Sequence, residues 1–138
     1  MKLIRGFTLV EMLVVIAIIV VLASFVLYNV MQYIDKSKDA TLKSNLAVLI
    51  TAGELWYDRS SSSYVGFCGS TAVAKALSEP PPVSSSDRKC NVNPEGTAWA
   101  VCAREFVNSA KAYCVDNKGN QKEIDSSLCT DSITNCIP

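Results

Sequence analysis

The stretch Lys2-Leu3-Ile4-Arg5-Gly6-Phe7-Thr8-Leu9-Val10-Glu11 opens a segment that runs to Val30 and decides the fold. From Met12 to Leu27 every residue is apolar except Ser24. An apolar run of about 20 residues can cross the hydrocarbon core of a bilayer as a helix, because a helix satisfies its own backbone hydrogen bonds. The segment therefore predicts a membrane-inserted N-terminal helix.

The charges around this segment predict its orientation. Lys2 and Arg5 flank the N-terminal end, which favours a cytoplasmic location for that end and places everything after Val30 across the membrane. The alternative is a cleaved secretory signal peptide. Against that alternative, the positive region is short, the apolar run is long, and the small-residue site near Ala23 lies inside the run.

Glu11 is the only charged residue between Arg5 and Asp35. A charged side chain in a membrane helix costs roughly 2.5–3.5 kcal/mol near the bilayer centre and less near the interface. Two interpretations stay open on the residues alone. Either Glu11 has a partner or a function, or its carboxylate reaches the headgroups from just inside the membrane.

The segment Lys2–Glu11 resembles the leader and mature start of type IV pilins and type II secretion pseudopilins: a basic leader ends in Gly6, and Phe7, Thr-Leu-Val-Glu and a long apolar run follow. The resemblance implies that a prepilin peptidase cuts after Gly6 and that Phe7 is then N-methylated. It also implies that Phe7, Thr8 and Glu11 act in assembly, where the Glu11 carboxylate faces the N-terminal ammonium of a neighbouring subunit. Such a pair neutralises two charges that are each costly in lipid.

The resemblance also divides the chain. It implies a leader at residues 1–6, a membrane and polymerisation helix at residues 7–30, and a globular head at residues 31–138. Many family members have Pro or Gly in the second half of the membrane helix, where the helix can unwind on assembly. This chain has neither around Tyr28 and Asn29, so local melting in a filament stays an open question.

The 138 residues leave roughly 100 for one small soluble domain. The sequence has 13 basic and 13 acidic side chains, and loss of the leader would leave 11 basic against 13 acidic, a net charge of −2. This balance lacks the basic character of nucleic-acid binding proteins. No cofactor is expected.

The helical pattern continues beyond the membrane segment and predicts one helix from about Phe7 to Tyr57. Apolar or small residues form a stripe of helical period: Leu42, Leu46, Leu49, Ile50, Gly53 and Trp56. The polar side near the membrane carries Asp35, Lys36, Lys38, Asp39 and Lys43. Asp39 and Lys43 have the acid-first i,i+4 order that stabilises a helix.

The predicted fold class is α+β, with the long helix packed on a small antiparallel sheet and a disulfide-bonded C-terminal loop. Thr71–Leu77 is predicted as a short helix capped by Ser70 or Thr71. A Pro- and Ser-rich loop at Glu79–Ser86 follows it. Three strands are expected at 97–103, 110–116 and 120–124, with a hairpin turn at 116–119. Residues Trp99, Val101, Tyr113 and Val115 are expected to cover the helix stripe, and 125–138 to form an irregular loop.

All six cysteines follow residue 67: Cys68, Cys90, Cys102, Cys114, Cys129 and Cys136. An even number in the translocated part predicts disulfides, and a zinc site is not expected without histidine or a C-x-x-C pair. Sequence alone leaves the connectivity open. A hairpin turning near Asn108 would place Cys102 opposite Cys114, which favours that pair. Cys129 with Cys136 and Cys68 with Cys90 would complete the set.

The sequence has few features of catalytic, nucleotide-binding or metal-binding sites. The absence of histidine excludes Ser-His and Cys-His nucleophiles, and no phosphate-binding or dinucleotide glycine pattern occurs, so no enzyme is expected. Asp116–Asn120 faintly resembles a calcium loop, but a hairpin turn is favoured. Glu123, Asp125 and Asp131 are a weak calcium hypothesis. Trp56 and Trp99 are interpreted as core residues.

The predicted function is a structural subunit of a type IV pilus-like filament. Its expected partners are copies of itself, a prepilin peptidase and the inner-membrane assembly machinery. The precursor would lie in the inner membrane with its head outside. The alternatives are a pseudopilin in a periplasmic filament, or a minor pilin for adhesion or DNA uptake. Arg88, Lys89 and Lys111 would give the last alternative a basic patch.

Overall fold

The computed structural model describes residues 7–80 and 87–136 and divides into two compact units, one ending at Ile34 and the other beginning at Asp35. Helix α1, Leu9–Arg59, contributes to both units. The prediction of one helix from about Phe7 to Tyr57 is confirmed, with both ends shifted by two residues. The helix is unbroken at Tyr28 and Asn29. The leader, including Gly6, lies outside the described residues.

In the second unit, one face of α1 forms the core of the head. Leu42, Leu46 and Leu49 are at most 1% exposed, and Gly53 is buried one turn further on. This is the predicted apolar stripe. Gly53 is required here because Trp99 of the sheet lies against the helix, 2.8 Å from where a Cβ atom would stand. The stripe therefore positions the sheet on the helix.

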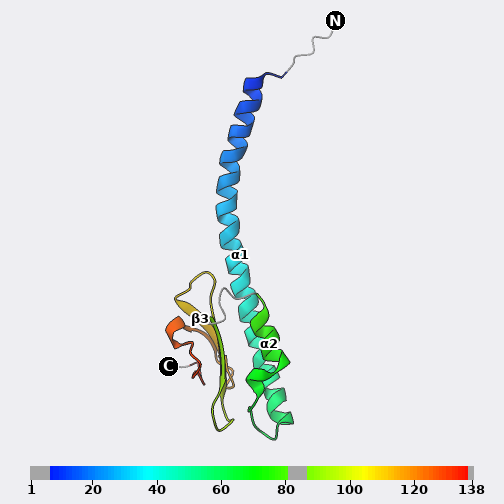
Figure 1. Cartoon of the computed structure of the whole chain (residues 1–138), viewed down its shortest axis with the longest axis vertical. Helices are drawn as coiled ribbons and strands as arrows, with labels where there is room; N and C mark the ends of the chain where they lie inside the picture. Colours follow the sequence, from blue (N-terminus) through cyan, green and yellow to red (C-terminus); the bar gives the residue numbers. More distant parts are fainter. Residues whose placement is uncertain (1–6, 81–86, 137–138) are drawn as a thin grey trace. The chain divides into compact units, whose positions relative to one another are not determined.

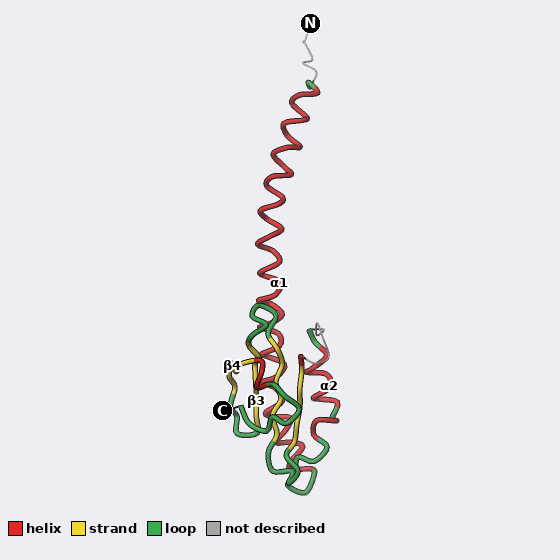
Figure 2. Tube along the Cα trace, turned by 60° about the vertical axis from the view of Figure 1, so that its left-hand side comes forward, coloured by secondary structure: helices red, strands yellow, loops and turns green. Residues whose placement is uncertain are grey.

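Within the described residues, four antiparallel strands form one sheet in the order β1-β2-β3-β4. Strands are drawn in yellow in Figure 2. Their bounds are β1 Arg88–Val92, β2 Trp99–Arg104, β3 Lys111–Asp116 and β4 Gln121–Asp125. The three expected strands are thus present with shifted ends. The sequence analysis missed β1, because its five residues include two cations and an asparagine. Cys90 and Val92 nevertheless pair with Val101 and Trp99 of β2.

Side chains alternate between the two faces along each strand, and both faces of this sheet carry apolar residues. One face carries Trp99, Val101 and Val115, which cluster with the α1 stripe. The opposite face carries Ala100, Cys102, Ala112 and Cys114, and it packs against Ile133 and Cys136 of the C-terminal segment. In Figure 1 the second half of α1 lies on one side of the sheet, and the orange and red C-terminal segment lies on the other.

The short helical elements η1 and α2 follow α1 along the chain. The 3-10 helix η1, Phe67–Gly69, brings the Phe67 ring to 4.8 Å from the Trp99 ring, between centroids. Helix α2, Thr71–Ser78, is the predicted short helix, and its N-cap is Ser70, whose side chain accepts a hydrogen bond from the Val73 N–H. Most of the predicted Pro- and Ser-rich loop, 81–86, lies outside the described residues.

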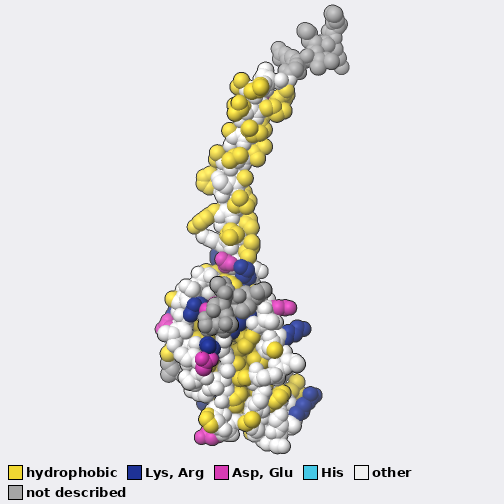
Figure 3. Space-filling model, in the orientation of Figure 1, with side chains coloured by type: hydrophobic (Ala, Val, Ile, Leu, Met, Phe, Trp, Pro, Cys, Tyr) yellow, Lys and Arg dark blue, Asp and Glu magenta, His cyan; other side chains and the backbone are white. Residues whose placement is uncertain are grey.

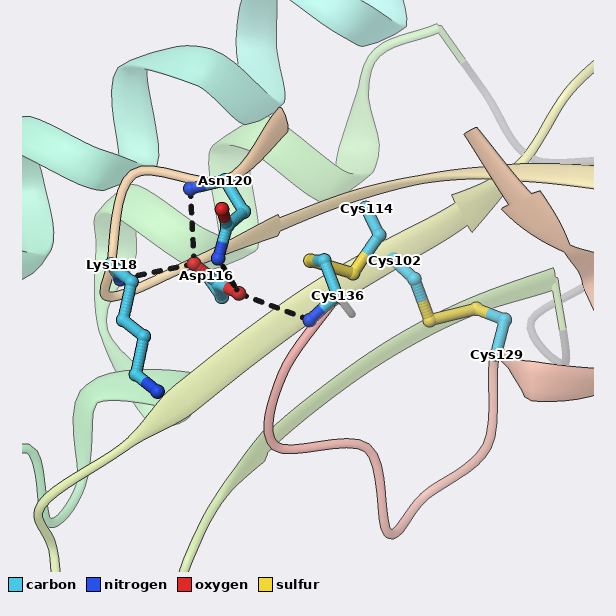
Figure 4. Close-up of a disulfide and its surroundings, with 7 residues drawn as sticks. All are labelled: Cys102, Cys114, Asp116, Lys118, Asn120, Cys129 and Cys136. Atoms are coloured by element: carbon cyan, nitrogen blue, oxygen red, sulfur yellow. Dashed lines mark hydrogen bonds between the residues drawn. A yellow bond between two sulfur atoms is a disulfide. The ribbon is translucent and has the colours of Figure 1, made fainter. Parts of the chain in front are cut away.

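The structure has three disulfides, and two of them differ from the expected pairs. Cys68 is joined to Cys90, which is the pairing expected from the sequence. The expected pairs Cys102–Cys114 and Cys129–Cys136 are wrong, because the bonds are Cys102–Cys129 and Cys114–Cys136. Figure 4 shows both bonds reaching from the strands to the C-terminal segment.

The two expected pairs are wrong because the C-terminal segment covers one face of the sheet. Cys102 and Cys114 are directly opposed in the β2–β3 register, as the hairpin argument predicted. Both side chains, however, lie on the face against which the C-terminal segment packs. Cys102 and Cys114 therefore each take a partner from that segment, where the 3-10 helix η3, Ser126–Leu128, precedes Cys129. The segment is irregular, as predicted, but it is bonded to the sheet and does not close on itself.

Candidate assembly site

The first turn of α1 is closed by two side chains, Thr8 and Glu11. The Glu11 carboxylate accepts hydrogen bonds on its Oε2 atom from the backbone N–H and the hydroxyl of Thr8, both at 2.9 Å. In return the Glu11 N–H donates to Thr8 Oγ1 at 3.3 Å. This is a capping box, in which the N-cap and the third helical residue satisfy each other's backbone N–H groups. Glu11 therefore has a partner within its own chain.

The sequence analysis missed this partner, although its signal was present. Thr8-Leu9-Val10-Glu11 fits the pattern of Ser or Thr followed three residues later by Glu or Gln, directly before an apolar run. The positive end of the helix dipole also favours an acid at this position. These interactions reduce the cost of a carboxylate in an apolar segment without any second subunit.

All described side chains of the first unit, residues 7–34, are exposed. The exposed fractions reach 70% at Phe7 and 78% at Leu9. Figure 3 shows hydrophobic side chains along the visible face of this part of α1. By length and composition, α1 is the one helix among the described residues that could cross a membrane. A surface of this kind needs lipid or other protein to cover it.

Two polar side chains of this part of α1, Ser24 and Asn29, bond to their own helix. The Ser24 hydroxyl donates to the carbonyl of Val21 at 2.7 Å, and the Asn29 side chain donates to the carbonyl of Phe25 at 2.9 Å. Such bonds satisfy polar groups where water is absent. This part of the helix therefore presents an apolar surface despite its serine and asparagine.

Comparisons with known proteins bear on this same segment. The family described as the prokaryotic N-terminal methylation motif matches residues 1–27. A relative, the type IV major pilin protein PilA of Myxococcus xanthus (strain DK1622), is 40% identical over 53 residues. The N-terminal segment is therefore similar to that of a type IV major pilin. The aligned residues cover 38% of this chain and 24% of the relative, so the chain matches about a quarter of that pilin's length. No solved structure matches the chain significantly.

In the pilin-like head, Asp39 does not form the expected helix pair with Lys43. Its carboxylate is 7% exposed and accepts hydrogen bonds from the backbone N–H groups of Phe106 at 2.6 Å and Val107 at 3.0 Å. Lys43 instead forms an ion pair with Glu105, at 2.7 Å, and its hydrogen bond to Glu105 raises the pKa of the Lys43 ammonium. Asp39 and Lys43 do not pair with each other, and each holds the β2–β3 loop against α1.

The three cations proposed as a basic patch are already engaged. The Arg88 side chain is buried and donates to the carbonyl oxygens of Leu77 and Pro80. Lys89 pairs with Asp131 at 2.9 Å, and Lys111 pairs with Asp125 at 2.8 Å. These positions therefore give little support to the alternative of a basic patch, because each cation has a local acceptor.

The acidic residues considered for calcium serve other contacts. Asp116 is fully buried and holds the β3–β4 turn by accepting hydrogen bonds from Lys118 N–H and from both the backbone and side chain of Asn120. Glu123, Asp125 and Asp131 each lie near a lysine. Within residues 7–80 and 87–136, no group of three or more acids and cysteines is placed to hold a metal ion.

The two tryptophans lie in the head, as interpreted from the sequence. Trp99 is fully buried. Trp56 is partly buried at the edge of the same cluster, and its indole N–H donates to the carbonyl of Val65 at 3.2 Å. Neither forms an exposed platform for a ligand.

Proposed function

We propose that this chain is a structural subunit of a pilus-like filament and that it assembles through the N-terminal part of α1. The observation that supports this most directly is the exposure of every described side chain from Phe7 to Ile34. Burying apolar surface gains about 25 cal/mol per Å². Copies of the same helix, packed together, would cover this surface once the subunit leaves the bilayer.

Maturation is the first step of the proposal. A prepilin peptidase would cut after Gly6, which lies outside the described residues, and the new N-terminus at Phe7 would be methylated. The capping box uses the N–H of Thr8 and not that of Phe7. Cleavage would therefore leave the Thr8–Glu11 contacts in place, and the start of the helix would be the same before and after processing.

Glu11 would then attract the N-terminal ammonium of a neighbouring subunit. Both hydrogen bonds from Thr8 are accepted by the Oε2 atom, which fixes the carboxylate at the helix start. An ammonium and a carboxylate are each costly in an apolar environment, and pairing in register removes both costs together. Subunits that are out of register would keep the penalty.

Two substitutions separate the charge of Glu11 from its capping role. Glu11→Gln keeps a side chain that can complete a capping box but removes the charge. Thr8→Val removes the capping hydroxyl but keeps the charge. We expect Glu11→Gln to insert normally and to lose most filament yield, while Thr8→Val reduces yield less.

The readouts are membrane fractionation and electron microscopy of sheared fibres, with Thr8→Ser as the control that keeps a hydroxyl. Wild-type filament yield from Glu11→Gln would contradict the charge-pair account. If no fibre contains the wild-type chain, the filament proposal itself fails.

A pseudopilin of a type II secretion system remains the alternative function, since its leader has the same pattern. Its filament would stay in the periplasm. Immunogold labelling of intact and permeabilised cells distinguishes the two, because a surface pilus is labelled without permeabilisation.

A further inference from the structure

We propose that the Cys68–Cys90 disulfide is a redox-sensitive tether, which a small thiol opens while the other two disulfides stay intact. The bond joins Cys68 of the 3-10 helix η1 to Cys90 in the middle of strand β1. Opening it frees η1 and the start of α2 from β1 and leaves the rest of the head folded. The inference concerns the head alone and does not depend on filament assembly.

The three disulfides differ in how far solvent reaches them. Cys68 and Cys90 are both partly exposed. Cys114 and Cys136 are at most 1% exposed, and Cys102 is fully buried. A disulfide is reduced when a thiolate attacks one of its sulfur atoms, so the rate of reduction depends on access. Cys68–Cys90 is the one bond of the three in which both cysteines are partly exposed.

Cys129 is also partly exposed, but the chemistry of its bond with Cys102 disfavours reduction. Attack on the Cys129 sulfur expels the sulfur of Cys102 as a thiolate. That charge forms in the apolar cluster beneath the C-terminal segment, and a charge without a partner is costly in apolar surroundings. Attack on Cys68 or Cys90 instead expels a thiolate from a partly exposed residue.

The reduction is a two-electron exchange with two molecules of a thiol such as glutathione. The first forms a mixed disulfide with one cysteine and expels the other, which takes up a proton. The second attacks the glutathione sulfur of the mixed disulfide and releases the remaining cysteine as a thiol. Two glutathione thiols thus become one disulfide, and the cysteine pair gains two electrons and two protons.

The end of α2 is held by contacts that do not involve sulfur. Arg88 of β1 donates hydrogen bonds to the carbonyl groups of Leu77 and Pro80. The Asn45 side chain of α1 donates to the carbonyl of Glu79 at 2.8 Å. These contacts remain after the disulfide opens, so the release is confined to η1 and the start of α2.

The released part has little packing of its own. Phe67 and Val73 are buried, but residues 68–72 between them are all exposed or partly exposed. Gly69 to Ala72 also border a hollow of about 490 Å³, whose opposite wall on α1 includes Leu55 and Trp56. Segments with few buried apolar contacts open locally at low cost in free energy. The disulfide therefore supplies a restraint that packing does not.

The test treats the purified full chain, in detergent, with increasing concentrations of reduced glutathione. Free thiols are alkylated at intervals and located by mass spectrometry of peptides. Cys114–Cys136 is the matched control within the molecule, because both bonds span a sequence separation of 22 and they differ in burial. We expect alkylation at Cys68 and Cys90 to be about tenfold faster or more, because a buried bond is attacked only after local opening.

Hydrogen exchange of the same samples tests the conformational part of the inference. The backbone N–H groups of Gly69, Ser70 and Ala74 donate to carbonyl groups within η1 and the first turn of α2. We expect these amides to exchange several-fold faster after reduction, and the amides of β2 and β3 to be unchanged. Replacing Cys68 and Cys90 together by serine should give the same faster exchange without glutathione. If that variant does not fold, the glutathione-treated wild type decides.

Each other outcome overturns the inference. Equal alkylation of Cys114 and Cys136, or no alkylation of Cys68 and Cys90, would refute selective reduction. Selective alkylation without faster exchange in η1 and α2 would show that the bond does not restrain them. Faster exchange throughout the sheet would show that the bond stabilises the whole head and is not a local device.

Discussion

The Asp116 carboxylate accepts a hydrogen bond from the backbone N–H of Cys136 at 3.0 Å, across 20 residues of chain. The same carboxylate holds the β3–β4 turn through Lys118 and Asn120. One buried side chain therefore joins the end of the sheet to the C-terminal segment, next to a disulfide that joins the same two elements (Figure 4).

Asp116→Asn is expected to destabilise the head by about 1–3 kcal/mol. The amide replaces one acceptor oxygen with a donor, so at least one buried N–H loses its partner. The measurement is urea unfolding of the purified full chain in detergent. Asp131→Asn is the control, since the Asp131 side chain is 86% exposed in its ion pair, and a change of at most about 0.5 kcal/mol is expected there.

The same substitution should change the response to acid. Burial raises the pKa of Asp116 and is the largest single effect, but the hydrogen bonds from Cys136, Asn120 and Lys118 together outweigh it and lower the pKa overall. A lowered pKa in the folded state means that the stability gained is present above the ordinary value of about 3.9 and is lost as pH falls through the folded value. Unfolding free energies measured from neutral to acidic pH should fall more steeply for the wild type than for Asp116→Asn. Parallel curves would contradict this role.

Gly53→Ala is expected to destabilise the head by about 1 kcal/mol or more. The new Cβ atom would stand 2.8 Å from the Trp99 ring, and overpacking costs about 1–3 kcal/mol, against about 0.5–1 kcal/mol gained from alanine in a helix. Gly69→Ala is the matched control, because no heavy atom lies within 4 Å of its new Cβ atom. Thermal or urea unfolding gives the comparison, and a more stable Gly53→Ala would show that Trp99 is free to move.

Asp39→Ala should release the tip of the β2–β3 hairpin, residues 106–110, from α1. The N–H groups of Phe106 and Val107 would lose their acceptor, so we expect faster hydrogen exchange at these two amides and a loss of about 1.5–3 kcal/mol. Asp58→Ala, on an exposed position of the same helix, should leave both amides protected. Unchanged exchange in Asp39→Ala would mean that the ion pair of Lys43 with Glu105 holds the loop without help.

The disulfide pattern has a direct chemical test. Peptides from the unreduced chain should link Cys102 to Cys129 and Cys114 to Cys136, and a peptide linking Cys102 to Cys114 would overturn the observed connectivity. Replacing Cys114 and Cys136 together by serine should cost about 2–5 kcal/mol. The Cys102–Cys129 bond should still form in that variant.

The helices and strands could be predicted where the sequence has a regular pattern of apolar residues. The apolar run and the stripe from Leu42 to Gly53 predicted α1, and period-two patterns predicted β2 and β3. β1 gave no such signal, because its inward position at Arg88 is occupied by a cation that is satisfied by two carbonyl groups of another segment. A local pattern does not contain that information.

The contacts that fix the site could be predicted only in part. The Thr8–Glu11 capping box is local, so its spacing could have predicted it, although the sequence analysis did not recognise it. Asp39 has the same local signature as any exposed helical acid, and its partners lie in a distant loop. The opposition of Cys102 and Cys114 followed from hairpin geometry, but their bonding depended on which segment covers that face.

The two bonds between the sheet and the C-terminal segment have a mechanical consequence. Cys102–Cys129 and Cys114–Cys136, together with the hairpin between 102 and 114 and the chain between 129 and 136, form a closed covalent ring. Strands β2 and β3 cannot be pulled far apart while this ring is intact, even if every hydrogen bond between them breaks. The resistance of this hairpin to being pulled apart therefore depends on the oxidation of the two bonds.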